Sequence, residues 1–133
     1  MQIELATIDR IPVVWDACMK FMRGYISQPE SMFTEHGLRV DIEAGRKQLW
    51  LIHDGKEPFA SLVTEILESG DRRICAVLLL SGTAMERWLG LQSTIAAWAR
   101  DHGCVALRIH GREGWERVLK EWRKVGVIME KAI

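Results

Sequence analysis

The segment 73–124 limits the possible folds more than any other part of the chain. An apolar run over 74–80 is followed by the small-residue turn 81–83, a tryptophan-containing amphipathic stretch, a second strand-like run over 104–109 and another amphipathic stretch from Trp115. This order predicts a βαβα unit with two parallel strands. In such units ligands bind where the carboxyl ends of the strands meet the amino ends of the helices. The sequence therefore predicts a site at the ends of these two strands.

The rest of the pattern predicts further strands and helices around this unit. Asp54-Gly55 is a strong hairpin signal between two apolar runs. We expect strands over Ile3–Ile8, Gln48–His53, Phe59–Leu67, Arg73–Leu80, Cys104–Ile109 and Val125–Ile133, and helices from Pro12, from Ser27 (a capping box with Glu30), from Thr83 (a capping box with Glu86) and from Trp115. The prediction is one α/β domain over residues 1–133, a mixed twisted sheet of about six strands with helices on both faces.

Composition argues against several classes of function. Eighteen basic residues balance eighteen acidic ones, so no net field attracts nucleic acid or an anionic membrane surface. The longest apolar run, Ile74–Leu80, is far shorter than the ~20 residues that span a bilayer, and no signal peptide is expected at the amino terminus. Three separated cysteines, two of them in apolar runs, indicate reduced, buried thiols and a cytoplasmic protein. His102 and Cys104 lack a second ligand pair, so no metal site is expected.

The predicted order of elements resembles the GNAT (Gcn5-related N-acetyltransferase) fold over nearly the whole chain. In that family acetyl-CoA lies in a wedge between two splayed parallel strands, here Arg73–Leu80 and Cys104–Ile109. The stretches Gly111–Trp115, Trp98–Cys104 and Leu49-Trp50 are similar to those of small GNAT-like proteins of tailed phages and prophages. The resemblance implies an acetyl-CoA-dependent acetyltransferase of phage type.

The resemblance places the coenzyme's diphosphate on the turn after the first parallel strand. Its cofactor-binding residues would be Leu80, Ser81, Gly82, Thr83 and Ala84, with Arg112 as a clamp for an anion. The turn departs from the family pattern, since it has one glycine where two are usual and no leading Arg or Gln. The alternative is a plain capped turn, in which Thr83 and Glu86 satisfy the same backbone donors.

Two residues are candidates for the base that deprotonates an acceptor amine. Glu65 lies among apolar neighbours in a predicted strand, where the family often has a carboxylate, and His110 follows the second parallel strand. The alternatives are that Glu65 faces solvent and that His110 is a solvated residue at a tight corner. The family also has a tyrosine near the start of the last helix. Trp115 occupies that region here, and the single tyrosine, Tyr25, falls in the first predicted helix.

Three hypotheses for function follow. The first is an N-acetyltransferase that uses acetyl-CoA and acylates an amine. The second is an inactive GNAT-fold protein that binds a virion or host protein, for which Trp15, outside the apolar stripe of its helix, would be an anchor if exposed. The third is a sensor that binds a small ligand in the same wedge without chemistry.

Overall fold

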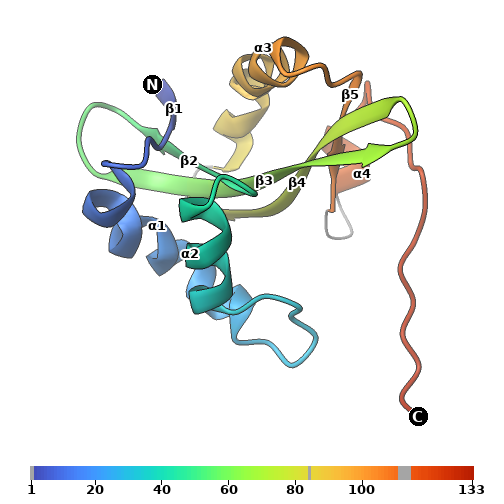
Figure 1. The fold of residues 1–133 in the computed structure, drawn as a ribbon, viewed down its shortest axis with the longest axis horizontal. Coiled ribbons are helices and arrows are strands. Elements are labelled where there is room, and N and C mark those ends of the chain that lie inside the picture. Colours follow the sequence, from blue (N-terminus) through green and yellow to red (C-terminus); the bar gives the residue numbers. More distant parts are fainter. Residues whose placement is uncertain (1, 84, 111–114) are drawn as a thin grey trace.

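The computed structural model describes residues 2–83, 85–110 and 115–133. Within them the chain forms one five-stranded sheet in the order β1-β2-β3-β4-β5, with four antiparallel strands and β5 parallel to β4 (Figure 1). The elements are β1 (Gln2–Leu5), α1 (Ile11–Ile26), α2 (Glu35–Glu43), β2 (Gln48–His53), β3 (Pro58–Ser69), β4 (Arg72–Gly82), a 3₁₀ helix (Met85–Gly90), α3 (Gln92–Asp101), β5 (Ala106–Ile109) and α4 (Trp115–Val118). The mixed α/β architecture is confirmed, and the described sheet has five strands where about six were expected.

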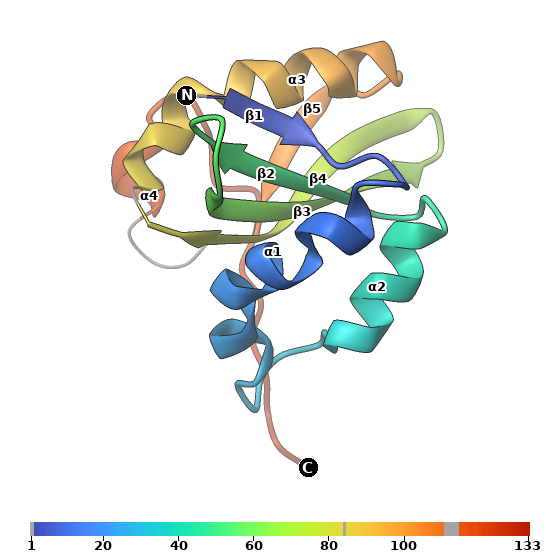
Figure 2. The same cartoon turned by 90° about the vertical axis from the view of Figure 1, so that its left-hand side faces the viewer.

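Helices cover both faces of the sheet, as the sequence predicted (Figure 2). Helices α1 and α2 bury one core cluster against alternate residues of β2, β3 and β4, including Leu49, Leu51, Val63 and Leu79. On the other face, α3 and the 3₁₀ helix bury Trp88 and Ile95 against residues that include Trp50, Leu62 and Val77. Because successive side chains of a strand alternate between faces, β2, β3 and β4 supply both clusters. No helix in the described part of the chain is long and apolar enough to cross a membrane.

The contact between α1 and α2 contradicts two predictions. Trp15 is buried, with 6% of its surface exposed, and its indole N–H donates to Glu35 at 3.0 Å. Trp15 therefore does not meet the condition, exposure to solvent, under which it would be an anchor for a partner. Helix α2 begins after Thr34, whose hydroxyl accepts from the Gly37 amide, rather than at Ser27. Ser27 instead caps the carboxyl end of α1, since its amide donates to the Arg23 carbonyl.

Two further predictions, both for the carboxyl-terminal half of the chain, differ from the structure. The helix expected from Thr83 is a 3₁₀ helix followed by α3, and Gly103, two residues after α3 ends, has the left-handed conformation (φ +82°) predicted for it. The expected strand Val125–Ile133 is irregular and exposed, and it leaves the body of the molecule (Figure 1). Its alternating apolar residues have strand propensity, but a strand is held by pairing. No strand of the described chain pairs with this segment.

A β-bulge in β4 re-aims the strand that forms the predicted site. Val63 of β3 pairs with Leu79, whereas its neighbour Thr64 pairs with Val77, so Leu78 is an extra residue. Beyond this bulge Leu79 faces α1, although Val77 faces α3. Bulges bend a strand and increase its local twist. The end of β4 is thereby turned relative to the part that pairs with β5.

Candidate functional site at the end of β4

Strands β4 and β5 separate before β4 ends. Their pairing runs from Ile74↔Ala106 to Val77↔Ile109, and the His110 amide donates to the Val77 carbonyl at 3.1 Å. Strand β4 continues for five more residues, to Gly82. The strands thus part at Val77, directly before the bulge, rather than at Leu80 as the sequence indicates. One edge of β4 over residues 78–82 has no strand partner in the described chain, and we refer to this edge and the small pocket beside it as the opening.

The backbone of Leu80 faces this opening. The Thr83 amide donates to the Phe59 carbonyl at 2.8 Å, which fixes the alternation of the β3–β4 ladder. In this register the backbone groups of Ser81 and Leu79 point to β3, and those of Leu80 and Gly82 point away from it. No strand of the described chain pairs with β4 on that side after Val77. The opening therefore presents peptide donors and acceptors to a ligand.

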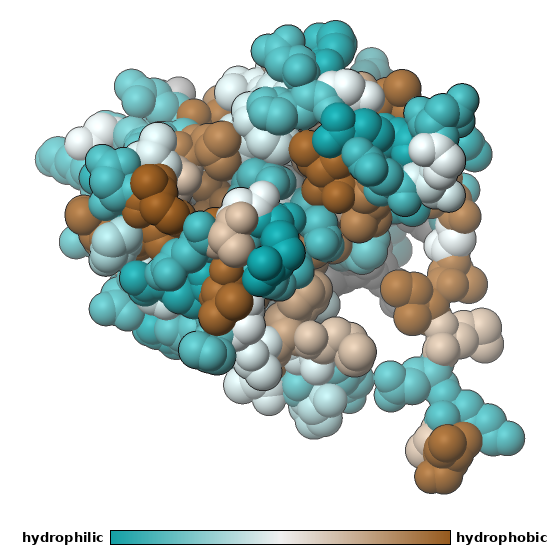
Figure 3. All heavy atoms as spheres, viewed as in Figure 1, coloured by the Kyte–Doolittle hydropathy of each residue, from teal (hydrophilic) through white to brown (hydrophobic). Residues whose placement is uncertain are grey.

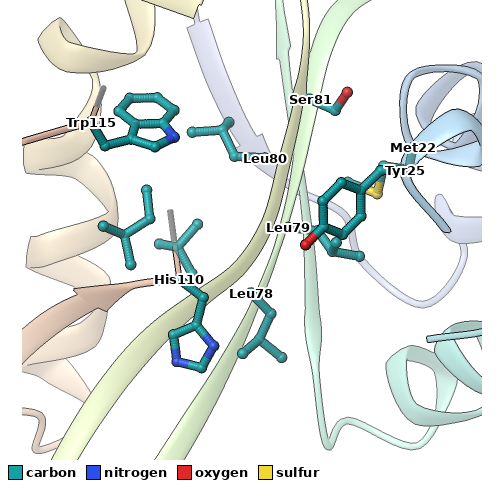
Figure 4. Close-up of a pocket in the computed structure, with 10 residues that line it drawn as sticks. Met22, Tyr25, Leu78, Leu79, Leu80, Ser81, His110 and Trp115 are labelled. Atoms are coloured by element: carbon teal, nitrogen blue, oxygen red, sulfur yellow. The ribbon is translucent and has the colours of Figure 1, made fainter. Parts of the chain in front are cut away.

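A small pocket lies around this edge of β4. Figure 4 shows His110, Trp115 and Leu80 on one side of the strand, and Tyr25 and Met22 of α1 on the other. The pocket has a volume of about 50 Å³. Sites that enclose a whole drug-sized ligand measure roughly 300–1,000 Å³. This pocket therefore fits a small group, such as the acyl end of a larger ligand, with the rest lying outside it.

The predicted cofactor-binding residues fall partly on this pocket. Leu80 and Ser81 line it, whereas Gly82 and Thr83 follow them at the end of the strand. The Ser81 hydroxyl is directed to α1, where it donates to the Phe21 carbonyl at 2.5 Å. The Ser81 backbone points to β3, so neither its hydroxyl nor its peptide groups face the opening, and Leu80 is a predicted residue whose backbone does. Ala84 and Arg112 lie outside the described residues.

The close approach of β3 to the end of β4 requires a residue without a side chain at position 82. Its φ is +150°, and a Cβ at this position would lie 2.4 Å from the Ala60 Cα and 2.5 Å from the Phe59 carbonyl oxygen. Both neighbours belong to the backbone of β3, which cannot move aside as a flexible side chain can. The single glycine of the turn is thus explained by strand packing, independently of any diphosphate.

The two candidate bases lie in different places. His110 is exposed and lines the pocket. Glu65 pairs with Ala76 in the β3–β4 register, and its Oε1 lies 3.9 Å from the Nζ of Lys47. It is four residues along β3 from Ser61, the partner of Ser81, a separation of roughly 13 Å along the strand. The structure brings His110 to the opening and leaves Glu65 away from it; the catalytic role of each stays a prediction.

Tyr25 is a site residue that the sequence pattern does not reveal. The pattern assigns it to the first helix, yet the last turn of α1 places it on the pocket with Met22. A signal is present in the apolar stripe of α1, where Met22 and Tyr25 follow Cys18 at helical spacing. The stripe alone does not show that it packs on the end of β4, where the Ser61 and Ser81 hydroxyls donate to α1 carbonyls.

The three thiols are buried and unpaired, as predicted. Burial raises the pKa of Cys18 to about 12 and that of Cys75 to about 11. At neutral pH these groups are protonated and unreactive. Within the described residues no cluster of three or more His, Cys, Asp or Glu side chains is arranged to hold a metal ion.

Comparison with known proteins identifies the fold through solved structures. No protein-family model matches the sequence, and no curated protein matches it either. A probable acetyltransferase superposes with a TM-score of 0.71 at 14% identity, covering 100% of this chain and 97% of the other. An aminoglycoside acetyltransferase from an uncultured soil metagenomic sample, in complex with sisomicin, gives 0.72 at 10% identity, covering 99% and 95%.

A predicted acetyltransferase with acetyl-CoA from Clostridium acetobutylicum gives a TM-score of 0.69 at 8% identity, covering 98% of this chain and 95% of the other. Identities this low carry information on fold and not on activity. The bulged β4, its parting from β5 and these superpositions agree on one conclusion: the chain has the fold of the GNAT acetyltransferases.

Proposed function

We propose that this protein binds acetyl-CoA along the open edge of β4 and transfers the acetyl group to an amine. The observation that carries the proposal is the parting of β4 and β5 at Val77, which leaves the backbone of Leu80 without a strand partner beside a small pocket. Two structural neighbours support it: one is a predicted acetyltransferase with acetyl-CoA and another an aminoglycoside acetyltransferase, and aminoglycosides carry amines.

The residues present fit such a ligand. An extended chain with amide groups can add to an open strand edge through main-chain hydrogen bonds, and the pantetheine arm of the coenzyme is such a chain. The Leu80 N–H and C=O would hold that arm, and the pocket next to Leu80 is of the size of an acyl group. The diphosphate would lie beyond the end of β4, past Gly82.

The coenzyme supplies an acyl thioester, and this chain supplies a proton acceptor beside it. His110 lines the pocket and is exposed, so an acceptor amine can reach it from solvent. We assign to His110 the proton that the amine loses as its nitrogen bonds to the acyl carbon. The carbon–sulfur bond of the thioester would break in the same transfer, and the coenzyme would leave as a thiolate that takes up a proton from the protonated His110 or from solvent. Glu65, next to Lys47, would contribute only through an intervening water or a bound acceptor.

Because Glu65 lies away from the opening, a second function, binding without catalysis, is also supported. If His110 does not act as a base, the opening has no carboxylate among its described lining residues, and the fold would serve in binding alone. The resemblance to phage-encoded GNAT-like proteins makes a virion or host protein the partner under this second function. A small-ligand sensor would bind in the same opening and likewise lack turnover.

Titration calorimetry and thermal melting with acetyl-CoA test the first proposal. At a hundredfold excess over its Kd, the ligand stabilises the fold by about 2.7 kcal/mol, which corresponds to a rise in Tm of roughly 5–10 °C. Acetylation of a panel of amines, aminoglycosides included, then separates an enzyme from a binding protein. His110→Ala should abolish turnover and leave the Kd within about twofold.

A charged side chain introduced at the end of β4 tests whether acetyl-CoA binds there. Thr83 is exposed, and Thr83→Glu sets a carboxylate beside the proposed diphosphate, so we expect the affinity for acetyl-CoA to fall at least about tenfold. The matched control is Ser69→Glu, an exposed hydroxyl residue at the opposite end of the β3–β4 hairpin, which should leave affinity unchanged. An absence of binding at millimolar acetyl-CoA, or equal weakening by both variants, would refute the proposal.

A further inference from the structure

Two serine hydroxyls hold α1 against the sheet beside the opening. Ser61 of β3 and Ser81 of β4 are register partners, and both side chains are directed to α1. The Ser61 Oγ donates to the Cys18 carbonyl at 2.9 Å. The Ser81 Oγ donates to the Phe21 carbonyl at 2.5 Å. Ser61 is fully buried, so water cannot replace its bond, and the two bonds together fix where α1 lies on the sheet.

The same two carbonyls hold the pocket residues of α1. In an α-helix the carbonyl of residue i accepts the amide hydrogen of residue i+4. The Cys18 carbonyl is therefore the helical partner of the Met22 amide. The Phe21 carbonyl is likewise the partner of the Tyr25 amide. Met22 and Tyr25 are the residues of α1 that line the pocket, so each serine bonds to the turn that carries one of them (Figure 4).

The bulge at Leu78 directs Ser81 to α1. Successive side chains of a strand alternate between the two faces of the sheet. Counted from Val77, which faces α3, a strand without the bulge would turn Ser81 to that same face. The extra residue reverses this, so Leu79 and Ser81 face α1. The bulge and the serine pair thus act on the same contact, between α1 and the end of β4.

Met22 and Tyr25 form a wall of the pocket on the α1 side of β4. Exposed apolar side chains, such as those that Figure 3 shows in brown along the carboxyl-terminal segment, can turn into solvent. Met22 cannot, because it is fully buried (0% exposed), and Tyr25 is 42% exposed. A group too long for the pocket of about 50 Å³ meets this wall and can enter only if α1 moves away from the sheet. The bonds from Ser61 and Ser81 oppose that movement.

We propose that the α1 wall, Met22 and Tyr25, limits the acyl group that the opening accepts to a short one, acetyl rather than butyryl. Ser61 and Ser81 are the positioning residues that keep this wall in place. The inference rests on the proposed binding of acetyl-CoA at the opening and adds which acyl thioesters bind there. One extra methylene in an apolar pocket changes discrimination by roughly 10–200-fold, and butyryl has two more than acetyl.

Titration calorimetry with two coenzymes tests the wall. The quantity measured is the length ratio, the Kd for butyryl-CoA divided by the Kd for acetyl-CoA, and we expect it to be at least about ten in the native protein. Tyr25→Ala removes part of the wall at a partly exposed position, which the fold tolerates, so the length ratio should fall toward one. Tyr25→Phe keeps the ring and should keep the length ratio.

A matched pair of variants tests the positioning role of Ser81. Ser81→Thr and Ser81→Val have side chains of the same shape and differ in whether a hydroxyl is present. Without the bond to the Phe21 carbonyl, Ser81→Val should lower the length ratio at least about threefold, because the wall shifts. Ser81→Thr keeps a donor and should keep the ratio.

Thr64→Val controls for a general loss of stability. Thr64 is also buried in β3, but its hydroxyl bonds to Trp50 and Gln48 rather than to α1. This variant should lower the Tm and leave the length ratio unchanged. A length ratio near one in the native protein, or equal ratios for Ser81→Thr and Ser81→Val, would overturn the inference and leave the proposed function standing. Failure of both coenzymes to bind the native protein would refute the proposed function and the inference together.

Discussion

Replacing Gly82 by alanine separates the structural requirement for this glycine from its proposed contact with a ligand. The added Cβ would lie 2.4 Å from the Ala60 Cα and 2.5 Å from the Ala60 Cβ, at a φ of +150°. The unfavourable backbone conformation costs about 1–2 kcal/mol, and forcing a methyl group against the neighbouring strand costs about 1–3 kcal/mol more. We therefore expect the free energy of unfolding to fall by about 2–5 kcal/mol.

Two other glycines supply matched controls for the same measurement. Gly45 has a φ of +79°, and an added Cβ there would have nothing within 4 Å, so Gly45→Ala should cost only the conformational part, about 1 kcal/mol. Gly24 lies within α1 with free space around it, so Gly24→Ala should stabilise by about 0.5–1 kcal/mol. Urea denaturation followed by tryptophan fluorescence measures all three. The reasoning is refuted if Gly82→Ala is no less stable than Gly45→Ala.

Two further predictions concern ionisable groups. Hydrogen bonds from Arg23 and Trp15 lower the pKa of Glu35 to about 2, below its ordinary value of 4.5, so the folded state gains stability from this carboxylate above pH 4.5 and loses it as the pH falls toward 2. Glu35→Gln should therefore flatten the dependence of stability on pH between these limits, as measured by urea denaturation at a series of pH values, whereas an unchanged curve would contradict the assignment. Because burial raises the pKa of Cys18 and Cys75, these thiols should react with Ellman's reagent at pH 8 only on unfolding, and rapid labelling of either thiol in the native protein would show that it is accessible.

Local patterns predict most strands of the sheet and helices on both of its faces. The predicted strand Gln48–His53 has the observed bounds, because its flanking turns are marked by Gly45 and by Asp54-Gly55. The predicted start of α2 is misplaced because Ser27 and Thr34 are both good caps. The choice between them depends on Glu35, which pairs with Arg23 and Trp15 of the preceding helix, and a tertiary contact of this kind is invisible to a local pattern.

The place where β4 and β5 separate follows from the predicted order of elements, but the residues that line the opening there do not. The parallel strands indicate where the opening lies, since that depends on the order of elements. The bulge at Leu78 depends on how β3 and β4 register, and it decides that Leu79 faces α1. Tyr25 belongs to the opening only because α1 packs there, which no local pattern reveals. The segment Val125–Ile133 has the pattern of a strand because propensity is local, whereas the partner that would make it one is absent from the described chain.

The central claim is that a coenzyme binds the backbone edge of β4 beyond the bulge. Amide hydrogen exchange with and without acetyl-CoA measures this edge directly, because a ligand hydrogen-bonded to Leu80 slows exchange of its N–H. We predict protection of amides over 78–83, and none over 68–72 at the far end of the hairpin. Binding that leaves the exchange of Leu80 unchanged, or that protects only residues remote from β4, would contradict the account.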